Sequence, residues 1–146
     1  MAEQSDAAQL AVELRTVVFR LIKKLRSQSS AHSKISLTER SVLKLLDQHP
    51  QLLPTELAAR EKVTTQAMSQ ILRHLTELGY ITRQALEADK RKVGISLSAE
   101  GRAYLQEVRH EVDEWLVKAL QETCSTEELA KVHQVLPALT KLVDAE

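Results

Sequence analysis

The chain has 146 residues, of which 43% are hydrophobic and 27% charged, and its formal net charge is zero. This length suits one domain with its own core, and no apolar run approaches the ~20 residues that span a bilayer. The polar N-terminal segment lacks the apolar region of a signal peptide, and the single cysteine, Cys124, excludes an internal disulfide. We therefore expect a cytoplasmic protein that does not contact a membrane. Three Gly and three Pro in the whole chain indicate a mainly helical fold.

The N-terminal part of the chain predicts two helices. Apolar side chains recur at helical spacing over residues 8–28, and Ser5 or Asp6 can cap this helix. A second apolar periodicity begins at residue 37, where Thr38 is the expected N-cap. It ends near His49, since the proline that follows cannot continue a helix. A polar connector separates the two helices.

Two more helices, joined by a short turn, follow at once. Residues 52–60 predict a short helix, and residues 61–63 predict a tight turn. The next helix spans residues 64–78, with Thr64 as its N-cap and Gly79 in place for a left-handed C-cap. Helix, short turn and helix in this order are the core of a helix-turn-helix, whose second helix is the recognition helix.

A charged hairpin follows the recognition helix. Residues 80–83 and 93–97 alternate apolar and polar side chains, which is typical of half-buried antiparallel strands. Residues 87–92 between them carry too much charge to be buried and are predicted to form the tip. A helix-turn-helix followed by such a hairpin, or wing, is a winged helix-turn-helix. The predicted fold class is therefore mainly α with a small β-hairpin wing.

Two further helices are predicted at the C-terminal end. Ser98 can cap a long helix, residues 124–128 break it, and residues 129–143 form the last one. The apolar faces of these helices and of residues 8–28 are wider than a winged unit of about 60 residues can cover. The economical solution is a homodimer whose N- and C-terminal dimerisation helices pack against those of a second copy. The alternative is a monomer whose terminal helices form a bundle over the winged unit.

The charge is unevenly distributed along the chain. Residues 60–97 hold seven basic and four acidic residues, a net charge of +3, whereas residues 98–146 hold five basic and ten acidic ones, a net charge of −5. The basic segment coincides with the recognition helix and the wing. A DNA-binding protein needs positive potential at its contact face rather than an overall basic composition. The alternative is a chance asymmetry on a solvated surface.

The polar face of the recognition helix offers the residue types that read bases. Gln hydrogen-bonds to adenine edges and Arg to guanine or phosphate, while Ser and Thr near a helix N-terminus suit phosphates or bases. The predicted DNA-binding residues of this face are Thr64, Thr65, Gln66, Ser69, Gln70 and Arg73. We expect Thr65, Gln66, Ser69 and Gln70 to contact bases, and Arg73 to contact a base or the DNA backbone. The alternative is the solvated face of an ordinary amphipathic helix.

At the wing, Arg91 is the candidate to enter the minor groove of DNA, because the negative potential there favours a guanidinium. Asp89, two residues earlier, can brace the Arg91 side chain or shape the turn. Lys90 and Lys92 would contact phosphates. The alternative is a charged tip that merely protects exposed strand edges from pairing.

Six short motifs follow one another along the chain. They are Leu37-Thr38 with Val42-Leu43; Leu57-Ala58; residues 64–73 with Leu75; Leu78-Gly79-Tyr80-Ile81 with Arg83; Asp89-x-Arg91; and Ile95-x-Leu97-Ser98-x-Glu100-Gly101. In this order and spacing the chain resembles the MarR family of bacterial transcription regulators over nearly its whole length. Two features depart from the family pattern. The wing tip lacks the frequent Pro and Asp-Arg-Arg run, and the turn at residues 60–63 lacks the Gly often seen there.

The resemblance implies an obligate two-fold dimer that binds a palindromic operator. It divides the chain into residues 1–36 as N-terminal dimerisation helix and connector, 37–100 as winged helix-turn-helix, and 101–146 as C-terminal dimerisation helices. It also implies release from DNA by a small-molecule effector, bound near residues 14–25 and 40–46. The expected function is a sequence-specific repressor of bacterial promoters, with an activator of the same fold as the alternative.

Two other classes of function compete with a DNA-binding regulator. A non-catalytic protein-interaction module would not need Gln66, Gln70 or Arg91 to bind its partner. An enzyme has no support, because the sequence lacks a Gly-rich phosphate loop, a nucleophile motif and a metal cluster; we expect no catalytic residue, metal or cofactor. Cys124 lies among acidic residues and is expected to be structural rather than redox-active. DNA binding that weakens with rising salt would separate a regulator from both alternatives.

Overall fold

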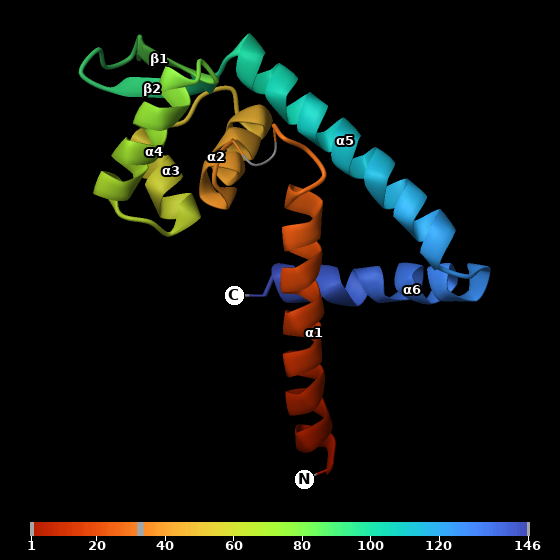
Figure 1. The fold of residues 1–146 in the computed structure, drawn as a ribbon. Coiled ribbons are helices and arrows are strands. Elements are labelled where there is room, and N and C mark those ends of the chain that lie inside the picture. Colours follow the sequence, from red (N-terminus) through yellow and green to blue (C-terminus); the bar gives the residue numbers. More distant parts are fainter. Residues whose placement is uncertain (1, 32–33, 146) are drawn as a thin grey trace.

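The computed structural model describes residues 2–31 and 34–145, which form six helices and one antiparallel pair of strands (Figure 1). In the middle of the chain lie α2 (Leu37–Gln48), α3 (Pro54–Glu61), α4 (Thr65–Glu77), β1 (Ile81–Ala85) and β2 (Val93–Leu97). The flanking helices are α1 (Ala2–Arg26), α5 (Ala99–Thr123) and α6 (Thr126–Val143). Across the described ranges, no helix is long and apolar enough to cross a membrane.

Helices α2, α3 and α4 and the β1–β2 hairpin share one hydrophobic core, and we call this part of the chain the winged unit. Fully buried side chains from each of these elements except β1 meet at its centre: Leu43, Leu57, Met68, Leu72, Leu75 and Ile95. Burying each such side chain contributes about 1.5–3 kcal/mol. The same core takes in Tyr104, Leu105 and Val108, so that the first half of α5 is fixed to the winged unit. The fold class expected from the sequence is confirmed.

The hairpin is held by a regular register that runs from Ile81 opposite Leu97 to Ala85 opposite Val93. Leu52 adds one more pair on the other side of β2, since it exchanges backbone hydrogen bonds of 3.0 and 2.8 Å with Ile95. The prediction of a helix from residue 52 is therefore wrong at its start. Leu52 is extended, and α3 begins at Pro54, where the fixed φ of proline suits the first helical turn.

Three predicted helix caps are confirmed, and one of them is Ser98, whose hydroxyl accepts the N–H of Gly101 at 3.0 Å at the start of α5. Thr64 caps α4, because its hydroxyl accepts the backbone N–H of Ala67 at 3.0 Å. Gly79 has φ +78°, the left-handed conformation expected after the recognition helix. Thr64 and Gly79 fix where α4 begins and where the chain turns into the hairpin.

Two other predicted caps are wrong. The N-cap of α2 is Ser36 rather than Thr38: Ser36 Oγ accepts the N–H of Glu39 at 3.1 Å, and the Glu39 carboxylate accepts the N–H of Ser36 at 2.7 Å. This reciprocal capping box satisfies two backbone donors at once, which Thr38 cannot do from inside the helix. Ser5 and Asp6 also lie inside a helix, because α1 begins at Ala2.

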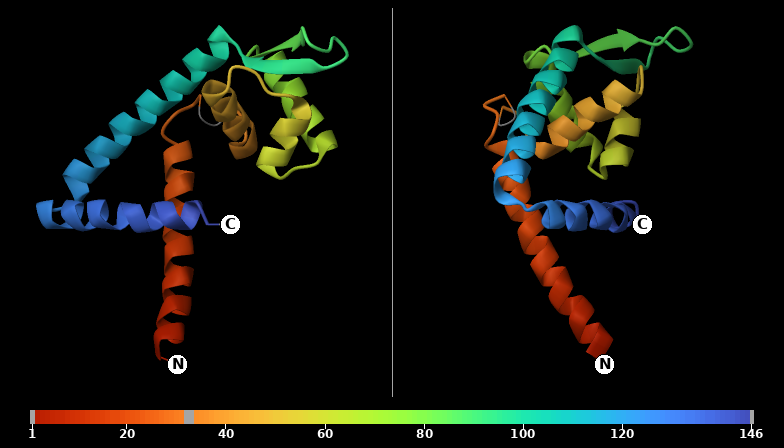
Figure 2. Two further views of the ribbon diagram at one scale, coloured as in Figure 1. Left: turned by 180° about the vertical axis from the view of Figure 1, so that it is seen from behind. Right: turned by 90° about the vertical axis from the view of Figure 1, so that its right-hand side faces the viewer.

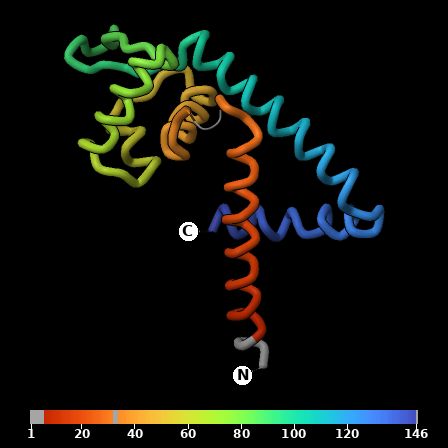
Figure 3. The backbone as a smooth tube through the Cα atoms, in the orientation of Figure 1, coloured from red at the N-terminus to blue at the C-terminus, as the bar shows by residue number. Residues whose placement is uncertain are grey.

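Helix α1 extends away from the winged unit, whereas α6 turns back at the far end of α5 and crosses the line of α1 at a distance from that unit (Figures 2 and 3). Many of their apolar side chains are exposed, with Phe19 of α1 65% and Val143 of α6 83% exposed, and no residue of α6 is buried. A monomeric protein rarely exposes so large an apolar surface.

Candidate nucleic-acid interface

Helix α4 has one face in the core and the opposite face in solvent. Met68, Leu72 and Leu75 are buried against α2 and α3, at the helical spacing that the sequence shows. The six predicted DNA-binding residues of this helix, Thr64, Thr65, Gln66, Ser69, Gln70 and Arg73, are all exposed. The core therefore fixes the helix, and its polar face is free to meet a large ligand.

These six side chains differ in how many hydrogen bonds they can still make. The Thr64 hydroxyl already caps the helix, and the Ser69 hydroxyl donates to the backbone oxygen of Thr65 at 3.0 Å. Within the described part of the chain, Gln66, Gln70 and Arg73 make no side-chain hydrogen bond. These three keep their full donor and acceptor capacity, and they are the best placed for bidentate contacts to base edges.

At the wing, Asp89 both shapes the turn and braces Arg91. One carboxylate oxygen of Asp89 accepts the backbone N–H and the Nε–H of Arg91, each at 3.1 Å, and Arg91 Nη2 lies 3.4 Å from the other oxygen. These hydrogen bonds lower the pKa of Asp89 below that of an ordinary aspartate. The Arg91 side chain is nevertheless 91% exposed. Lys90 and Lys92 beside it are also exposed, so the tip presents three cations to solvent.

The base of the wing is tied to the end of α4. Ser98 Oγ donates to the backbone oxygen of Gly79 at 2.5 Å and accepts the N–H of Gly101 at 3.0 Å. A side chain at Gly101 would place its Cβ 2.2 Å from the Tyr80 oxygen, so α5 packs closely against the start of the hairpin. The wing therefore leaves α4 from a rigid base, at the C-terminal end of that helix (Figure 1).

Two supporting residues escape sequence reasoning. His74 of α4 contacts Glu39 of α2, with 2.5 Å between Nδ1 and Oε1. The two residues are 35 positions apart, and no local pattern joins them. Arg83 on β1 is exposed, with its Nε 3.4 Å from the Thr76 hydroxyl. Arg83 lies two residues after the buried Ile81, on the same face of β1, so strand alternation would not have marked it as a further cation beside α4.

The described residues contain no group of His, Cys, Asp and Glu arranged to hold a metal ion. What the site offers is a hydrogen-bonding helix face, neutral except for Arg73, beside a cationic loop tip. This arrangement suits a long polyanion whose neutral edges are read by amides and whose charges are met by Arg and Lys. Double-stranded DNA has these properties.

Comparisons with known proteins agree with this chemistry. A model of the MarR family matches residues 35–93. An HTH-type transcriptional regulator of Mycobacterium bovis is 32% identical over 113 residues, which are 77% of this chain and 78% of that one. An HTH-type transcriptional repressor of Mycobacterium tuberculosis is 40% identical over 77 residues, 51% of this chain and 55% of the repressor. A crystal structure of a Pseudomonas aeruginosa transcriptional regulator covers 97% of this chain and 98% of its own, with 32% identity and a TM-score of 0.78.

Proposed function

The chain belongs to the MarR family of transcription regulators, and on this premise we propose that two copies of it bind a palindromic operator and repress transcription by covering promoter DNA. The observation that carries the proposal is the exposed polar face of α4 beside a wing whose Arg91 is braced by Asp89. The similarity to a protein named as a repressor favours repression over activation.

The proposed contacts follow from the free hydrogen-bonding groups. Thr65, Gln66, Ser69 and Gln70 would read bases in the major groove, and Arg73 would contact a base or the backbone. Arg91 would enter the adjacent minor groove, while Lys90 and Lys92 meet phosphates. The Asp89 carboxylate would keep the guanidinium pointed in one direction, which reduces the entropy lost on binding.

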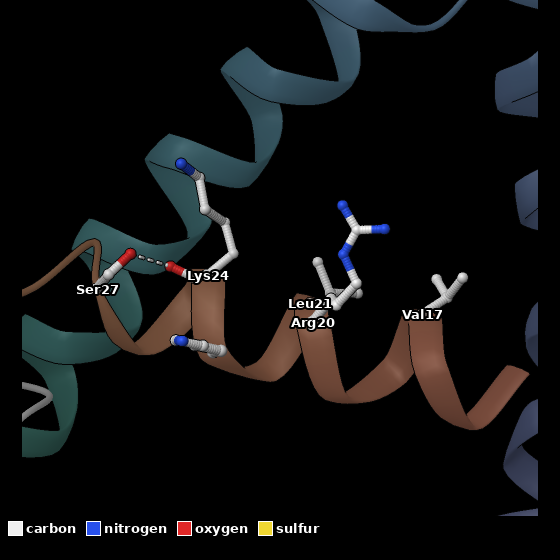
Figure 4. A pocket seen from close by; sticks show the side chains of 6 residues that line it. Val17, Arg20, Leu21, Lys24 and Ser27 are labelled. Atoms are coloured by element: carbon white, nitrogen blue, oxygen red, sulfur yellow. Dashed lines mark hydrogen bonds between the residues drawn. The ribbon is translucent and has the colours of Figure 1, made fainter.

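The exposed apolar faces of the outer helices support a dimer. A groove of about 740 Å³ runs along α1, and all six residues that line it belong to or directly follow that one helix (Figure 4). Val17 and Leu21 project from the same side of the helix into this groove. We propose that a second copy covers this face and that of α6. Residues 1–36 and 101–146 would then form the dimer, and residues 37–100 would bind DNA.

A cavity of about 230 Å³ between α1, α2 and α5 is the proposed effector site. Its wall includes Ile22 and Leu25 from α1 and the cationic residues Arg40 and Lys44 from α2. Burial lowers the pKa of Lys44, and the neighbouring cations Arg40 and Arg109 lower it further. An anionic, partly apolar effector would relieve this repulsion. It would shift the population towards dimers whose recognition helices no longer fit two half-sites.

The test begins with selection of an operator from a library of genomic fragments by the wild-type protein. Fluorescence anisotropy then measures binding to the selected duplex at several salt concentrations. We expect binding that weakens steeply with salt, and a large loss of affinity for Arg91→Ala. Selection of no sequence, or equal binding of Arg91→Ala and wild type, would contradict the proposal.

A further inference from the structure

Lys62 has an unusual backbone conformation. Its φ is 54° and its ψ is 42°, and in the described ranges it is the one residue other than glycine with a positive φ. The left-handed region is unfavourable for an L-residue with a side chain, and glycine is the usual residue at this place after a helix. A lysine here makes the folded turn less stable than glycine would, which points to a function for the lysine side chain.

The surroundings leave the turn little freedom to relax. The N–H of Lys62 bonds to the Ala59 oxygen at 3.3 Å, and the N–H of Val63 bonds to the Ala58 oxygen at 3.1 Å. Next to them, the Ser41 hydroxyl donates to Glu61 Oε1 at 2.6 Å and ties the end of α3 to α2. The left-handed conformation is thus imposed by the fold and does not depend on which side chain residue 62 carries.

The Lys62 ammonium is exposed, and it makes no ion pair or hydrogen bond with any residue that the structure describes. Its acidic neighbour, Glu61, is engaged by Ser41. The turn lies at the N-terminal end of α4, opposite the end from which the wing leaves (Figure 1). Cations are therefore present at both ends of the helix, with Lys62 at one end and the wing residues at the other.

We propose that Lys62 binds a DNA phosphate at the edge of the major groove opposite the wing. An α-helix in the major groove has a phosphate backbone on either side, and the wing supplies charge on one side only. The second cation would set the position of α4 in the groove and add affinity that does not depend on base sequence. Lys62 would thus lower the stability of the turn and raise the affinity for DNA. This inference rests on the proposed function.

Three variants separate charge from backbone conformation. Lys62→Gln removes the charge and keeps a side chain, and Lys62→Gly removes both the charge and the strain. Lys62→Arg is the matched control, because it changes the side chain and keeps the charge. Binding is measured by fluorescence anisotropy on two 30-base-pair duplexes, one selected by the wild-type protein and one of random sequence. Thermal unfolding is followed by circular dichroism.

We expect Lys62→Gln and Lys62→Gly to weaken binding to both duplexes by about 1.4- to 5-fold for each copy bound. The slope of log K against log salt should become shallower by about 0.9 per copy, whereas Lys62→Arg keeps the wild-type slope. Lys62→Gly should also raise the unfolding temperature by about 2–4 °C while it lowers affinity. A merely structural lysine would not separate stability from affinity in this way.

Unchanged affinity and salt slope in Lys62→Gln, with wild-type binding intact, would overturn the phosphate contact and leave the proposed function standing. If Lys62→Arg binds DNA as weakly as Lys62→Gln does, the phosphate contact is overturned as well. The loss of positive charge would then not explain the weaker binding. No DNA binding by the wild-type protein would instead overturn the proposed function, and this inference with it.

Discussion

His74 Nδ1 of α4 lies 2.5 Å from Glu39 Oε1 of α2, while the second oxygen of the same carboxylate accepts the backbone N–H of Ser36 at 2.7 Å. One side chain thus caps α2 and holds the recognition helix. Glu39 is only 8% exposed, so little water can replace a lost partner. Removal of either partner would leave part of the carboxylate buried without a hydrogen bond. The orientation of the proposed DNA-binding face therefore depends on a carboxylate that is not among the proposed DNA contacts.

We predict that Glu39→Ala lowers the free energy of unfolding by about 1–3 kcal/mol, because the capping bond and the imidazole contact are lost together. His74→Ala should cost less, since His74 is half exposed and its removal leaves the capping box intact. The measurement is urea unfolding at one fixed protein concentration, with the double variant completing a mutant cycle. Additivity within about 0.5 kcal/mol would show that the two side chains do not interact.

Gln66 tests direct base reading. Gln66→Ala should weaken binding to the selected operator by about 1–3 kcal/mol and relax the preference at one base pair of each half-site. Binding to random DNA should not change, because the side chain is uncharged. Anisotropy with a set of single-base operator variants measures both effects, and Gln48→Ala at an exposed position of α2 is the control. Equal losses on operator and random DNA would assign Gln66 to the backbone instead.

Asp89 tests the brace at the wing. Asp89→Ala frees the Arg91 guanidinium and removes a negative charge near the DNA. We therefore predict a lower ratio of operator affinity to random-DNA affinity, which competition binding measures. The pKa of Asp89 is lowered, so the contact exists above the ordinary pKa of Asp and is lost only as the pH falls through that lower value. Affinity that depends on Asp89 should thus be constant from about pH 5 to 8. An unchanged affinity ratio would contradict the brace.

Tyr104 gives a pH-dependent prediction for the core. Its hydroxyl donates to the Ala31 oxygen at 2.7 Å, and burial, followed by the neighbouring Tyr80, raises its pKa to about 12. A raised folded-state pKa means that the contribution is complete below the unfolded value, near 10, and is lost as the pH rises through the folded value. Wild type should be more stable than Tyr104→Phe by about 1 kcal/mol at pH 8. The difference should shrink between pH 10 and 12. Urea unfolding measures it, and a constant difference would contradict the assignment.

The sequence predicts local structure correctly where a single residue determines a helix cap or a turn. Thr64 caps α4 and Gly79 takes the left-handed turn, because capping and positive φ are decided by the residue and its nearest neighbours. The prediction fails where two local solutions compete. Ser36 and Thr38 are both good caps, and the capping box with Glu39 decides for Ser36. Leu52 lies two residues before α3, but pairing with Ile95, far along the chain, keeps it extended.

The same distinction applies to the interface. An apolar stripe at helical spacing predicts which side of α4 is exposed, and all six predicted residues lie on that side. A spacing of two residues predicts that Asp89 can reach Arg91, and the contact is present. The bond between Glu39 and His74 and the conformation of Lys62 depend on how α2, α3 and α4 pack, and no local pattern specifies that packing.

The proposed function requires two copies of the chain that read two half-sites of one operator. The most direct measurement is sedimentation equilibrium of the wild-type protein with the selected duplex, beside a duplex cut to one half-site. We predict two chains on the full operator and much weaker binding to the half-site, with a two-fold symmetric pattern of protected bases. One chain on the full operator, or equal affinity for the full operator and the half-site, would contradict the central claim.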